Sequence, residues 1–361
     1  MRRMNVIGIA LATLALFSGV SCAQTGDSRR PLVLEQSGRW AGYGVSYGPF
    51  REGQRPGGPA PTVEQLREDL HILAEHFDLI RIYGSGSESE NVLRIIREDG
   101  LSLRVMVGAW LGHDTATESM LAGAEGPAEG ETEWLVDYET RLANRSQVAD
   151  AIRLANDYPE IVWALNIGNE TQVSWSGHKV SPERLIEHLR WARMSTDAPV
   201  TTADDYNFWN KPESVAVSAE CDLIALHAYG MWNKQLLEDA VSWGAEQMHQ
   251  IQELHGPGIP IVITEAGWAT SKIDTGWQGE LIVGEPGVGP QTEFTKAFLG
   301  WAAENGVVHF LFEAFDEPWK GGDVPAEVEK NWGLWYESRE PKPAAEWLMI
   351  HGPRAAARSG G

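Results

Sequence analysis

Two stretches of the chain are apolar runs that end in a glutamate. Residues 161–170 read Ile-Val-Trp-Ala-Leu-Asn-Ile-Gly-Asn-Glu, and residues 260–268 read Pro-Ile-Val-Ile-Thr-Glu-Ala-Gly-Trp. Near-continuous apolar runs of this length are typical of strands that are buried in a parallel sheet. The polar tips Glu170 and Glu265 would then lie at the C-terminal ends of two such strands, where α/β barrels place their active sites.

A pair of carboxyl groups in such a place can cleave a glycosidic bond. One carboxylic acid protonates the leaving oxygen while the other carboxylate attacks the anomeric carbon, and a separation of about 5–5.5 Å gives retention of configuration. We expect Glu170 to be the general acid/base and Glu265 the nucleophile, while Asn169 can donate to the sugar 2-hydroxyl. For either glutamate alone, a solvated or salt-bridged carboxylate is the simpler interpretation, and the spaced pair is what favours catalysis.

Eight short apolar runs, most of them followed by a helix-like segment, indicate how these tips are positioned. Alternation of strands and helices over about 310 residues predicts an α/β fold of the (β/α)8, or TIM barrel, type in a single domain. A doubly wound sheet is the alternative, but no glycine-rich phosphate loop follows the first strand. The predicted strands are Tyr43–Tyr47, Leu79–Tyr83, Leu103–Ala109, Val162–Ile167, Val200–Ala203, Leu223–Ala228, Ile261–Thr264 and Val307–Phe312.

Several helices carry start and stop signals. Thr62 and Gln65 form a predicted capping box before an amphipathic stretch, and Ser181 precedes a proline at a first helical position. Gly306 is typical of a helix stop after residues 291–305. Two long connections, 112–132 and 269–290, would lie on the face formed by the strand C-termini.

The ends of the chain are predicted to lie outside the barrel. Residues 1–23 have a basic start, an apolar run and small residues, which is typical of a secretory signal. Cleavage after Ala23 and lipid attachment at Cys22 both remain open, so we expect an exported protein that is periplasmic, secreted or an outer-membrane lipoprotein. Residues 24–37 are predicted to be a flexible segment, 38–352 the catalytic domain and 353–361 a C-terminal tail.

Composition excludes several classes of partner. The formal net charge is −22, so the surface would repel nucleic acid and tolerate a neutral substrate. No HxH or HExxH pattern occurs, and we expect neither a catalytic metal nor a cofactor. Cys221 is expected to be an inert core residue without a disulfide, and the protein is expected to be a monomer.

Six segments, in order along the chain, resemble those of glycoside hydrolase family 17, the β-1,3-glucanase family of (β/α)8 retaining enzymes. The likeness extends from Gly42 to about Trp335, and members of the bacterial type are more similar than plant members. The segments are Gly44-Val45-Ser46-Tyr47-Gly48, Ile80-Arg81-Ile82-Tyr83, Ile167-Gly168-Asn169-Glu170, Thr264-Glu265-Ala266-Gly267-Trp268, Phe315-Asp316-Glu317-Pro318-Trp319-Lys320 and Glu329-Lys330-Asn331-Trp332-Gly333-Leu334-Trp335.

The resemblance implies further site residues. Glu317, Lys320 and Glu329 would surround the pair and bind the sugar beside the scissile bond, although an ordinary salt-bridge network is the alternative. Tyr229 would donate to the nucleophile, or else be a packed tyrosine at the barrel mouth. The remaining candidates for lining the pocket or stacking on sugar rings are Tyr47, Tyr83, Trp268 and Trp319.

Three functions are compatible with these residues. The first is a retaining β-1,3-glucan hydrolase acting on laminarin-type glucans, and the second is a β-1,3-glucanosyltransferase with the same covalent intermediate. The third, a glycan-binding barrel without catalysis, is disfavoured because both glutamates are present. Phe-Asp-Glu-Pro-Trp replaces the family's Phe-Asn-Glu at residues 315–319, and the remodelled loops leave the choice between internal and end-wise cleavage open.

Overall fold

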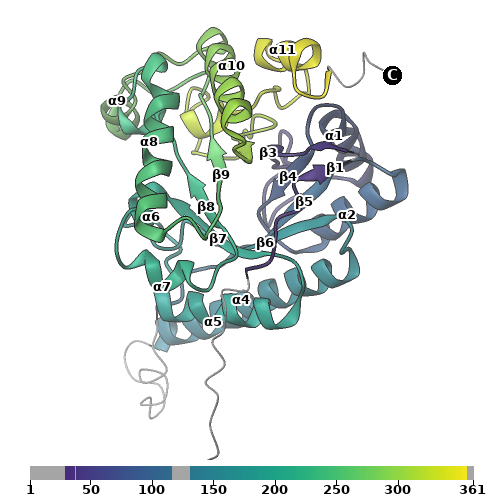
Figure 1. Ribbon diagram of the computed structural model, residues 1–361, viewed down its shortest axis with the longest axis vertical. Coiled ribbons are helices and arrows are strands. Elements are labelled where there is room, and N and C mark those ends of the chain that lie inside the picture. Colours follow the sequence, from purple (N-terminus) through teal and green to yellow (C-terminus); the bar gives the residue numbers. More distant parts are fainter. Residues whose placement is uncertain (1–28, 37, 116–130, 356–361) are drawn as a thin grey trace, which may run out of the picture.

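Eight parallel strands close into a barrel in the computed structural model, which describes residues 29–36, 38–115 and 131–355. The strand order around the barrel is β10-β3-β4-β5-β6-β7-β8-β9, so every strand pairs with its neighbours in sequence and the last pairs with the first. Helices surround the strands (Figure 1). The predicted (β/α)8 fold is confirmed, and the open doubly wound alternative is excluded.

The barrel strands are close to the predicted ones. Each is buried over most of its length because helices cover the outside and side chains fill the inside. The strand that leads to Glu170 is longer than predicted and reaches Asn169, while the last begins two residues later, at His309. The strands are β3 (Tyr43–Ser46), β4 (Leu79–Ile82), β5 (Arg104–Ala109), β6 (Val162–Asn169), β7 (Val200–Asp205), β8 (Ile224–His227), β9 (Ile261–Ala266) and β10 (His309–Leu311).

The predicted start and stop signals occur at three helix ends, although α10 begins at Val288 and not at residue 291. Thr62 and Gln65 form the capping box of α1, the Ser181 hydroxyl accepts from the Arg184 backbone N–H of α5, and Gly306 ends α10 with φ 63°. The helices are α1 (Val63–His76), α2 (Ser87–Asp99), α4 (Glu131–Asp157), α5 (Pro182–Ser195), α6 (Tyr206–Trp209), α7 (Ser214–Ser218), α8 (Leu237–His255), α9 (Gly276–Leu281), α10 (Val288–Asn305) and α11 (Pro343–His351), with 3-10 turns η1 (Met231–Asn233) and η2 (Val328–Lys330).

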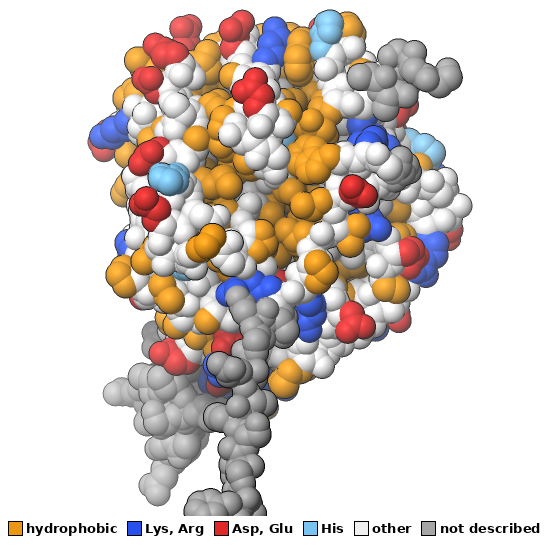
Figure 2. Space-filling view, in the orientation of Figure 1, with side chains coloured by type: hydrophobic (Ala, Val, Ile, Leu, Met, Phe, Trp, Pro, Cys, Tyr) orange, Lys and Arg blue, Asp and Glu red, His pale blue; other side chains and the backbone are white. Residues whose placement is uncertain are grey.

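The hydrophobic core has two parts. The larger part fills the space between the strands and the surrounding helices, and it includes Cys221, whose thiol pKa burial raises to about 12. The smaller part lies inside the barrel and contains Met106, Trp163 and Phe310. In the view of Figure 2, hydrophobic side chains gather at the centre of the molecule and charged ones lie around its edge.

The N-terminal segment differs from the prediction in its described part. Residues 24–37 were expected to be flexible, but β1 (Glu35–Gln36) pairs with β2 (Arg39–Trp40), and Leu34 packs against the core inside the barrel. The Trp163 indole N–H donates to the Val33 carbonyl oxygen over 2.9 Å. Apolar side chains in this segment therefore cover one end of the barrel. Residues 1–28 and 356–361, where the signal, the lipid-attachment site and most of the tail were predicted, lie outside the described residues.

No helix among the described residues is both long enough and apolar enough to span a bilayer.

A buried ion cluster fastens α1 to the C-terminal part of the chain. Arg339 bonds both carboxylate oxygens of Asp69, over 2.7 and 2.6 Å, and Tyr47 donates its hydroxyl to the same carboxylate over 3.0 Å. Arg51 adds a fourth contact at 2.9 Å. The Asp69 side chain is 0% exposed and that of Arg339 is 3% exposed, so each charge depends on the other for compensation.

Replacing Asp69 by Ala should lower the free energy of unfolding by about 3 kcal/mol, because it leaves a buried guanidinium without its partner. Glu98→Ala is the matched control, since Glu98 makes ion pairs with Arg67 and Arg94 at the surface and should contribute less than about 1 kcal/mol. Denaturant titration measures both. Equal midpoints for the two variants would contradict the cluster's role.

Candidate active site

Glu170 and Glu265 lie at the same end of the barrel. Glu265 is within β9, and Glu170 follows the last residue of β6. The backbone at Glu170 has φ 48°, and its N–H donates to the carbonyl oxygen of Ala203 on β7 over 2.8 Å. A non-glycine residue rarely adopts such a φ, and residues held in this way are concentrated at functional sites. The turn directs the Glu170 side chain across the mouth of the barrel.

The two carboxyl groups face each other across His227. One oxygen of Glu170, one oxygen of Glu265 and a His227 ring nitrogen all lie within 4.8 Å of one another. Nδ1 of His227 is 3.0 Å from Glu170 Oε1, and Nε2 is 3.4 Å from Glu265 Oε1. Such a close approach of two oxygens favours the carboxyl pair of retaining glycosidases, in which the groups are about 5–5.5 Å apart, over the wider pair of inverting ones.

Glu265 is held as a carboxylate by donors from two other strands. Arg81 contacts Oε1 at 2.5 Å, Tyr83 donates to the same oxygen over 3.0 Å, and Tyr229 donates to Oε2 over 2.6 Å. Burial on its own would raise the pKa of Glu265, but the charges of His227 and Arg81 and the bonds from Tyr229 and Arg81 bring it down to about 2. The predicted contact of Tyr229 is therefore present, and Tyr83 joins it.

Glu170 has a different environment. Its side chain is 28% exposed, whereas that of Glu265 is 7% exposed. Glu170 lies near another acidic residue, Asp204. Burial raises the pKa of Asp204 well above its usual range, and the charge of Glu170 raises the pKa of Asp204 further. An accessible carboxyl group beside other acids and an enclosed, ionised one are the two partners that acid and nucleophile roles require.

Asn169 is oriented by two contacts. Its side-chain oxygen accepts from Arg81 over 2.5 Å, and its backbone oxygen lies 2.8 Å from Nε2 of His178. The His178 ring packs against Trp110, with 4.5 Å between ring centroids. Because the amide oxygen of Asn169 is bound to Arg81, the amide nitrogen is the atom that faces away and can donate to a ligand.

Lys320 and Glu317 belong to a second ion cluster near the pair. The Lys320 ammonium lies 2.9 Å from Glu313 and 2.6 Å from Glu317, and the Trp319 indole N–H donates to Glu317 over 2.9 Å. Burial would lower the pKa of Lys320, but Glu313 and Glu317 raise it well above its usual value. The salt-bridge network considered from the sequence is therefore present.

Glu329 lies within electrostatic reach of both glutamates. Burial raises its pKa to about 7, and the charges of Glu327, Glu170 and Glu265 contribute to this rise although Lys320 opposes it. Near neutral pH this carboxyl group is accordingly divided between its protonated and ionised forms. It can donate or accept a hydrogen bond at the edge of the site.

Tyr47 and Trp268 do not line the pocket as predicted. Tyr47 is 1% exposed and its hydroxyl is bound to Asp69 in the structural cluster described above. Trp268 is 1% exposed and packs against Phe294 of α10, with its indole N–H donating to the Glu285 carbonyl oxygen over 2.9 Å. Both rings turn away from the mouth because their polar atoms find buried partners elsewhere.

Among the described residues, four tryptophan rings near the ends of strands or in loops are accessible, and Trp319 is the only one of them among the candidates above. Trp319 is 39% exposed, and its predicted stacking on a sugar ring stays a prediction. Trp110, at the end of β5, is 41% exposed, and Trp175, in the loop after Glu170, is 57% exposed. Trp277 of α9 is 78% exposed. Flat faces at such positions are able to pack on sugar rings.

Sequence reasoning missed Arg81, His227 and Glu313 as site residues. Arg81 and His227 are each 0% exposed and contact Glu265, and Glu313 is the fully buried partner of Lys320. For Arg81 and His227 the available signal was a charged or titratable residue inside an otherwise apolar strand of a sheet buried on both faces, whereas Glu313 follows the end of β10. Such a residue must find a partner in the interior.

Glu170, His227 and Glu265 each offer one atom to a cation. Oε1 of Glu265 already accepts hydrogen bonds from Arg81 and Tyr83. The positive charge of the guanidinium would repel a metal ion at that oxygen. These donors favour proton and covalent chemistry, and the absence of a metal stays a prediction from the sequence.

Comparisons with known proteins agree with this fold. A crystal structure of an endo-laminarinase from Formosa Hel1_33_131 is 23% identical, covers 84% of this chain and 85% of its own, and has a TM-score of 0.66. The β-1,3-glucanosyltransferase of glycoside hydrolase family 17 from Rhizomucor miehei is 18% identical and has a TM-score of 0.64. The superposition covers 84% of this chain and 96% of the transferase.

Two similar curated proteins are fungal. A putative glucan endo-1,3-beta-glucosidase btgC of Aspergillus niger is 26% identical over 303 residues, which are 79% of this chain and 40% of the relative. A glucan 1,3-beta-glucosidase of Schizosaccharomyces pombe is 24% identical and covers 79% of this chain and 81% of the relative. The chain thus spans less than half the length of the btgC proteins that it matches.

The family model for the BtgE/BtgC glycoside hydrolase domain matches residues 132–333, which is more than half of the chain and includes both glutamates. The match confirms the resemblance to a glycoside hydrolase family that the motifs indicated. This chain belongs to the BtgE/BtgC glycoside hydrolase domain family.

Proposed function

We propose that this protein hydrolyses β-1,3-glucans of the laminarin type by double displacement, with retention of the anomeric configuration. The observation that carries the proposal is the pair Glu170 and Glu265, whose oxygens lie within 4.8 Å while their environments differ. The names of the relatives, glucan endo-1,3-beta-glucosidase and endo-laminarinase, support the choice of substrate.

In the first step Glu265 attacks the anomeric carbon while Glu170 donates its proton to the leaving oxygen. The anomeric C–O bond to the leaving group breaks, and an ester bond between the sugar and Glu265 forms. In the second step Glu170 takes a proton from water, whose oxygen displaces Glu265. The Tyr229 hydroxyl and the Arg81 guanidinium hold the carboxylate in place before the attack and stabilise it when it leaves.

Six residues would bind the sugar in this proposal. Asn169 would donate to the 2-hydroxyl, and Trp319 would stack on a ring. Tyr83 has its hydroxyl on the nucleophile, so it would meet the sugar beside the scissile bond. Glu317, Lys320 and Glu329 would border the same pocket.

A β-1,3-glucanosyltransferase is the second candidate, since the Rhizomucor miehei neighbour carries that name. A transferase would share the first step with the hydrolase. In the second step the hydroxyl group of another sugar would attack in place of water. Incubation with one pure laminarioligosaccharide separates the two: products longer than the input favour transfer, and shorter products alone favour hydrolysis.

We also propose that the protein is exported and acts outside the cytoplasm. The basic, apolar and small residues of segment 1–23 support this. Attachment of a lipid to the Cys22 sulfur, with cleavage before Cys22, would anchor the protein to a membrane, whereas cleavage after Ala23 would release it. Mass spectrometry of the mature N-terminus distinguishes the two.

Glu170→Ala should reduce kcat on laminarin by about 10²–10⁴-fold and reduce it far less on an activated aryl β-glucoside, because only a poor leaving group needs protonation. Glu265→Ala should abolish turnover of both substrates. Glu280→Ala, which changes an exposed glutamate of α9, is the matched control. Equal losses on both substrates for Glu170→Ala would show that Glu170 is not the acid.

The first-formed product should be the β anomer, since two displacements at one carbon restore its configuration. Proton NMR during the first minutes of laminarin hydrolysis measures the anomer before mutarotation. An initial α product would mean that water attacks the anomeric carbon directly and that Glu265 forms no ester with the sugar.

Arg81→Gln should move the acidic limb of kcat/KM to higher pH. In the wild type the pKa of Glu265 is about 2, so the carboxylate persists at every pH above that value and is lost only as the pH falls through it. Removing the guanidinium raises this pKa, and protonation then begins at higher pH. Arg81→Lys retains the charge and should keep the limb low even if kcat falls. If the acidic limb of kcat/KM stays at the same pH in Arg81→Gln, the charge of Arg81 does not lower the pKa of Glu265.

A further inference from the structure

The turn that carries Glu170 has a backbone conformation that needs support. Gly168 has φ 81° and Glu170 has φ 48°, so residues of positive φ stand on both sides of Asn169. The pairing of β6 with β7 shifts its register over the same stretch, between Asn166 and Asn169. A left-handed backbone is unfavourable for a residue with a side chain, and it persists only where surrounding contacts hold it. The contacts that hold Glu170 therefore determine where its carboxyl group lies.

Two consecutive residues of β7 hold this turn. The Ala203 carbonyl oxygen accepts from the Glu170 N–H over 2.8 Å. Next to it, Oδ2 of Asp204 accepts from the Gln172 N–H over 2.9 Å, and Oδ1 accepts from the N–H of Asp205, also over 2.9 Å. Asp204 is 0% exposed. One buried carboxyl group thus fixes the chain two residues beyond Glu170, where the pairing of β6 with β7 has ended.

Ion pairing does not explain this buried carboxyl group. In the described part of the chain, Asp204 forms no ion pair with a lysine, arginine or histidine. Burial raises its pKa, and the charges of Glu170 and Asp205 raise it further, while the bonds from the Gln172 and Asp205 N–H groups lower it. A buried acid without an opposite charge is costly, and such groups are concentrated at functional sites. Its contact with the turn is what the molecule gains from it.

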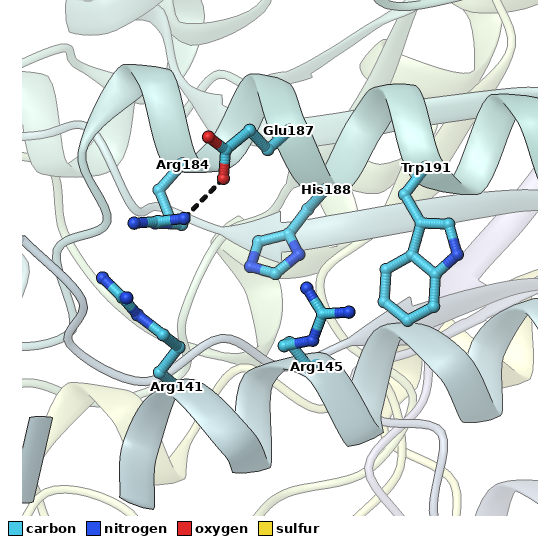
Figure 3. A pocket seen from close by; sticks show the side chains of 6 residues that line it. All are labelled: Arg141, Arg145, Arg184, Glu187, His188 and Trp191. Atoms are coloured by element: carbon cyan, nitrogen blue, oxygen red, sulfur yellow. Dashed lines mark hydrogen bonds and ion pairs between the residues drawn. The ribbon is translucent and has the colours of Figure 1, made fainter. Parts of the chain in front are cut away.

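The loop that follows the turn is fixed at its far end. Gln172 donates its side-chain amide to the Val180 carbonyl oxygen over 2.9 Å, which closes the loop of residues 171–181 on itself. The loop leads into α5, and α5 packs against α4. Figure 3 shows Trp191 of α5 pointing toward Arg145 of α4, whose Cζ atom lies 5.1 Å from the centroid of the Trp191 ring. The near end of the loop, at the turn, is therefore what remains to be fixed.

We propose that Asp204 is a positioning residue for the general acid/base. By holding the Gln172 N–H, it keeps the turn in the conformation that places the Glu170 carboxyl group beside the leaving oxygen. Asp204 acts through Glu170, because a side chain with no exposed surface touches neither the sugar nor the leaving group. Asp204 has this role only if Glu170 protonates the leaving oxygen, as the proposed function requires.

The nucleophile does not depend on the same contacts. Arg81 and Tyr229, which donate to the Glu265 carboxylate, lie in β4 and just beyond β8. Loss of the Asp204 carboxyl group should therefore impair proton transfer at Glu170 and leave the attack by Glu265 in place. A substrate or acceptor that needs no proton transfer should then react as before.

Asp204→Ala should lower kcat on laminarin at least about tenfold and lower it far less on an activated aryl β-glucoside, because only the poor leaving group of laminarin needs protonation. Sodium azide should raise kcat of this variant on the aryl glucoside. Azide displaces Glu265 from the anomeric carbon without losing a proton: a C–N bond forms, the ester C–O bond breaks and β-glucosyl azide is released. The wild type should not respond to azide.

Two further variants separate positioning from packing. Asp204→Asn keeps a side-chain oxygen that can accept from the Gln172 N–H, and it should retain kcat on laminarin within about threefold of the wild type. Asp204→Leu keeps a similar volume without an acceptor and should show the same selective loss, and it serves where the cavity left by Asp204→Ala prevents folding. Thr201→Val is the matched control on β7, because it removes a buried hydroxyl that donates to the Leu223 carbonyl oxygen over 2.7 Å. It should affect both substrates equally.

A selective loss with azide rescue in Asp204→Ala or Asp204→Leu, and its reversal in Asp204→Asn, supports the positioning role. Equal losses on both substrates without a response to azide, as in Thr201→Val, overturn it and make Asp204 a structural residue. Glu170→Ala is measured in the same assays. If it shows the selective loss while the Asp204 variants do not, the proposed function stands and only the role of Asp204 falls. If Glu170→Ala shows neither effect, both fall.

Discussion

The mouth of the barrel is organised around one enclosed negative charge, the carboxylate of Glu265. A charge that is withdrawn from water to this degree is costly unless hydrogen bonds and opposite charges replace the solvent. Arg81 comes from β4, Tyr83 follows it, His227 comes from β8 and Tyr229 lies just beyond. In the closed order of strands, β4 and β8 lie opposite each other. Only a closed sheet brings donors to the same carboxylate from both sides.

The same closure allows two carboxyl groups of one chemical type to differ in function. Glu265 projects from within β9 and its side chain is 7% exposed, whereas Glu170 lies beyond the end of β6, on a turn with φ 48°, and its side chain is 28% exposed. A nucleophile needs a fixed, ionised oxygen, and an acid/base must exchange its proton with water between steps. His227 lies between them and fixes the distance. The difference between the two glutamates thus follows from how far each stands along its strand.

The sequence was sufficient for the strands and for the residues at their tips, because periodicity and turn signals are local. It predicted the barrel, the pair and the hydroxyl of Tyr229. It did not predict the direction of every side chain. Tyr47 and Trp268 were expected in the pocket but lie in the core, where they bond Asp69 and the Glu285 carbonyl oxygen. Local patterns do not reveal these partners, because they are distant in sequence. Arg81 and His227 were missed because a charge inside an apolar strand was not treated as a requirement for a buried partner.

The second ion cluster connects the barrel interior to the rim. Glu317 lies so close to the backbone of Gly48 that a Cβ there would stand 2.0 Å from its Oε1, so the glycine is needed for the carboxylate to enter. Lys320 forms ion pairs with both Glu313 and Glu317, and Glu317 in turn accepts a hydrogen bond from the indole N–H of the accessible Trp319. A ring held in this way loses little rotamer freedom when a ligand packs on it. The buried charges therefore pre-organise an exposed surface.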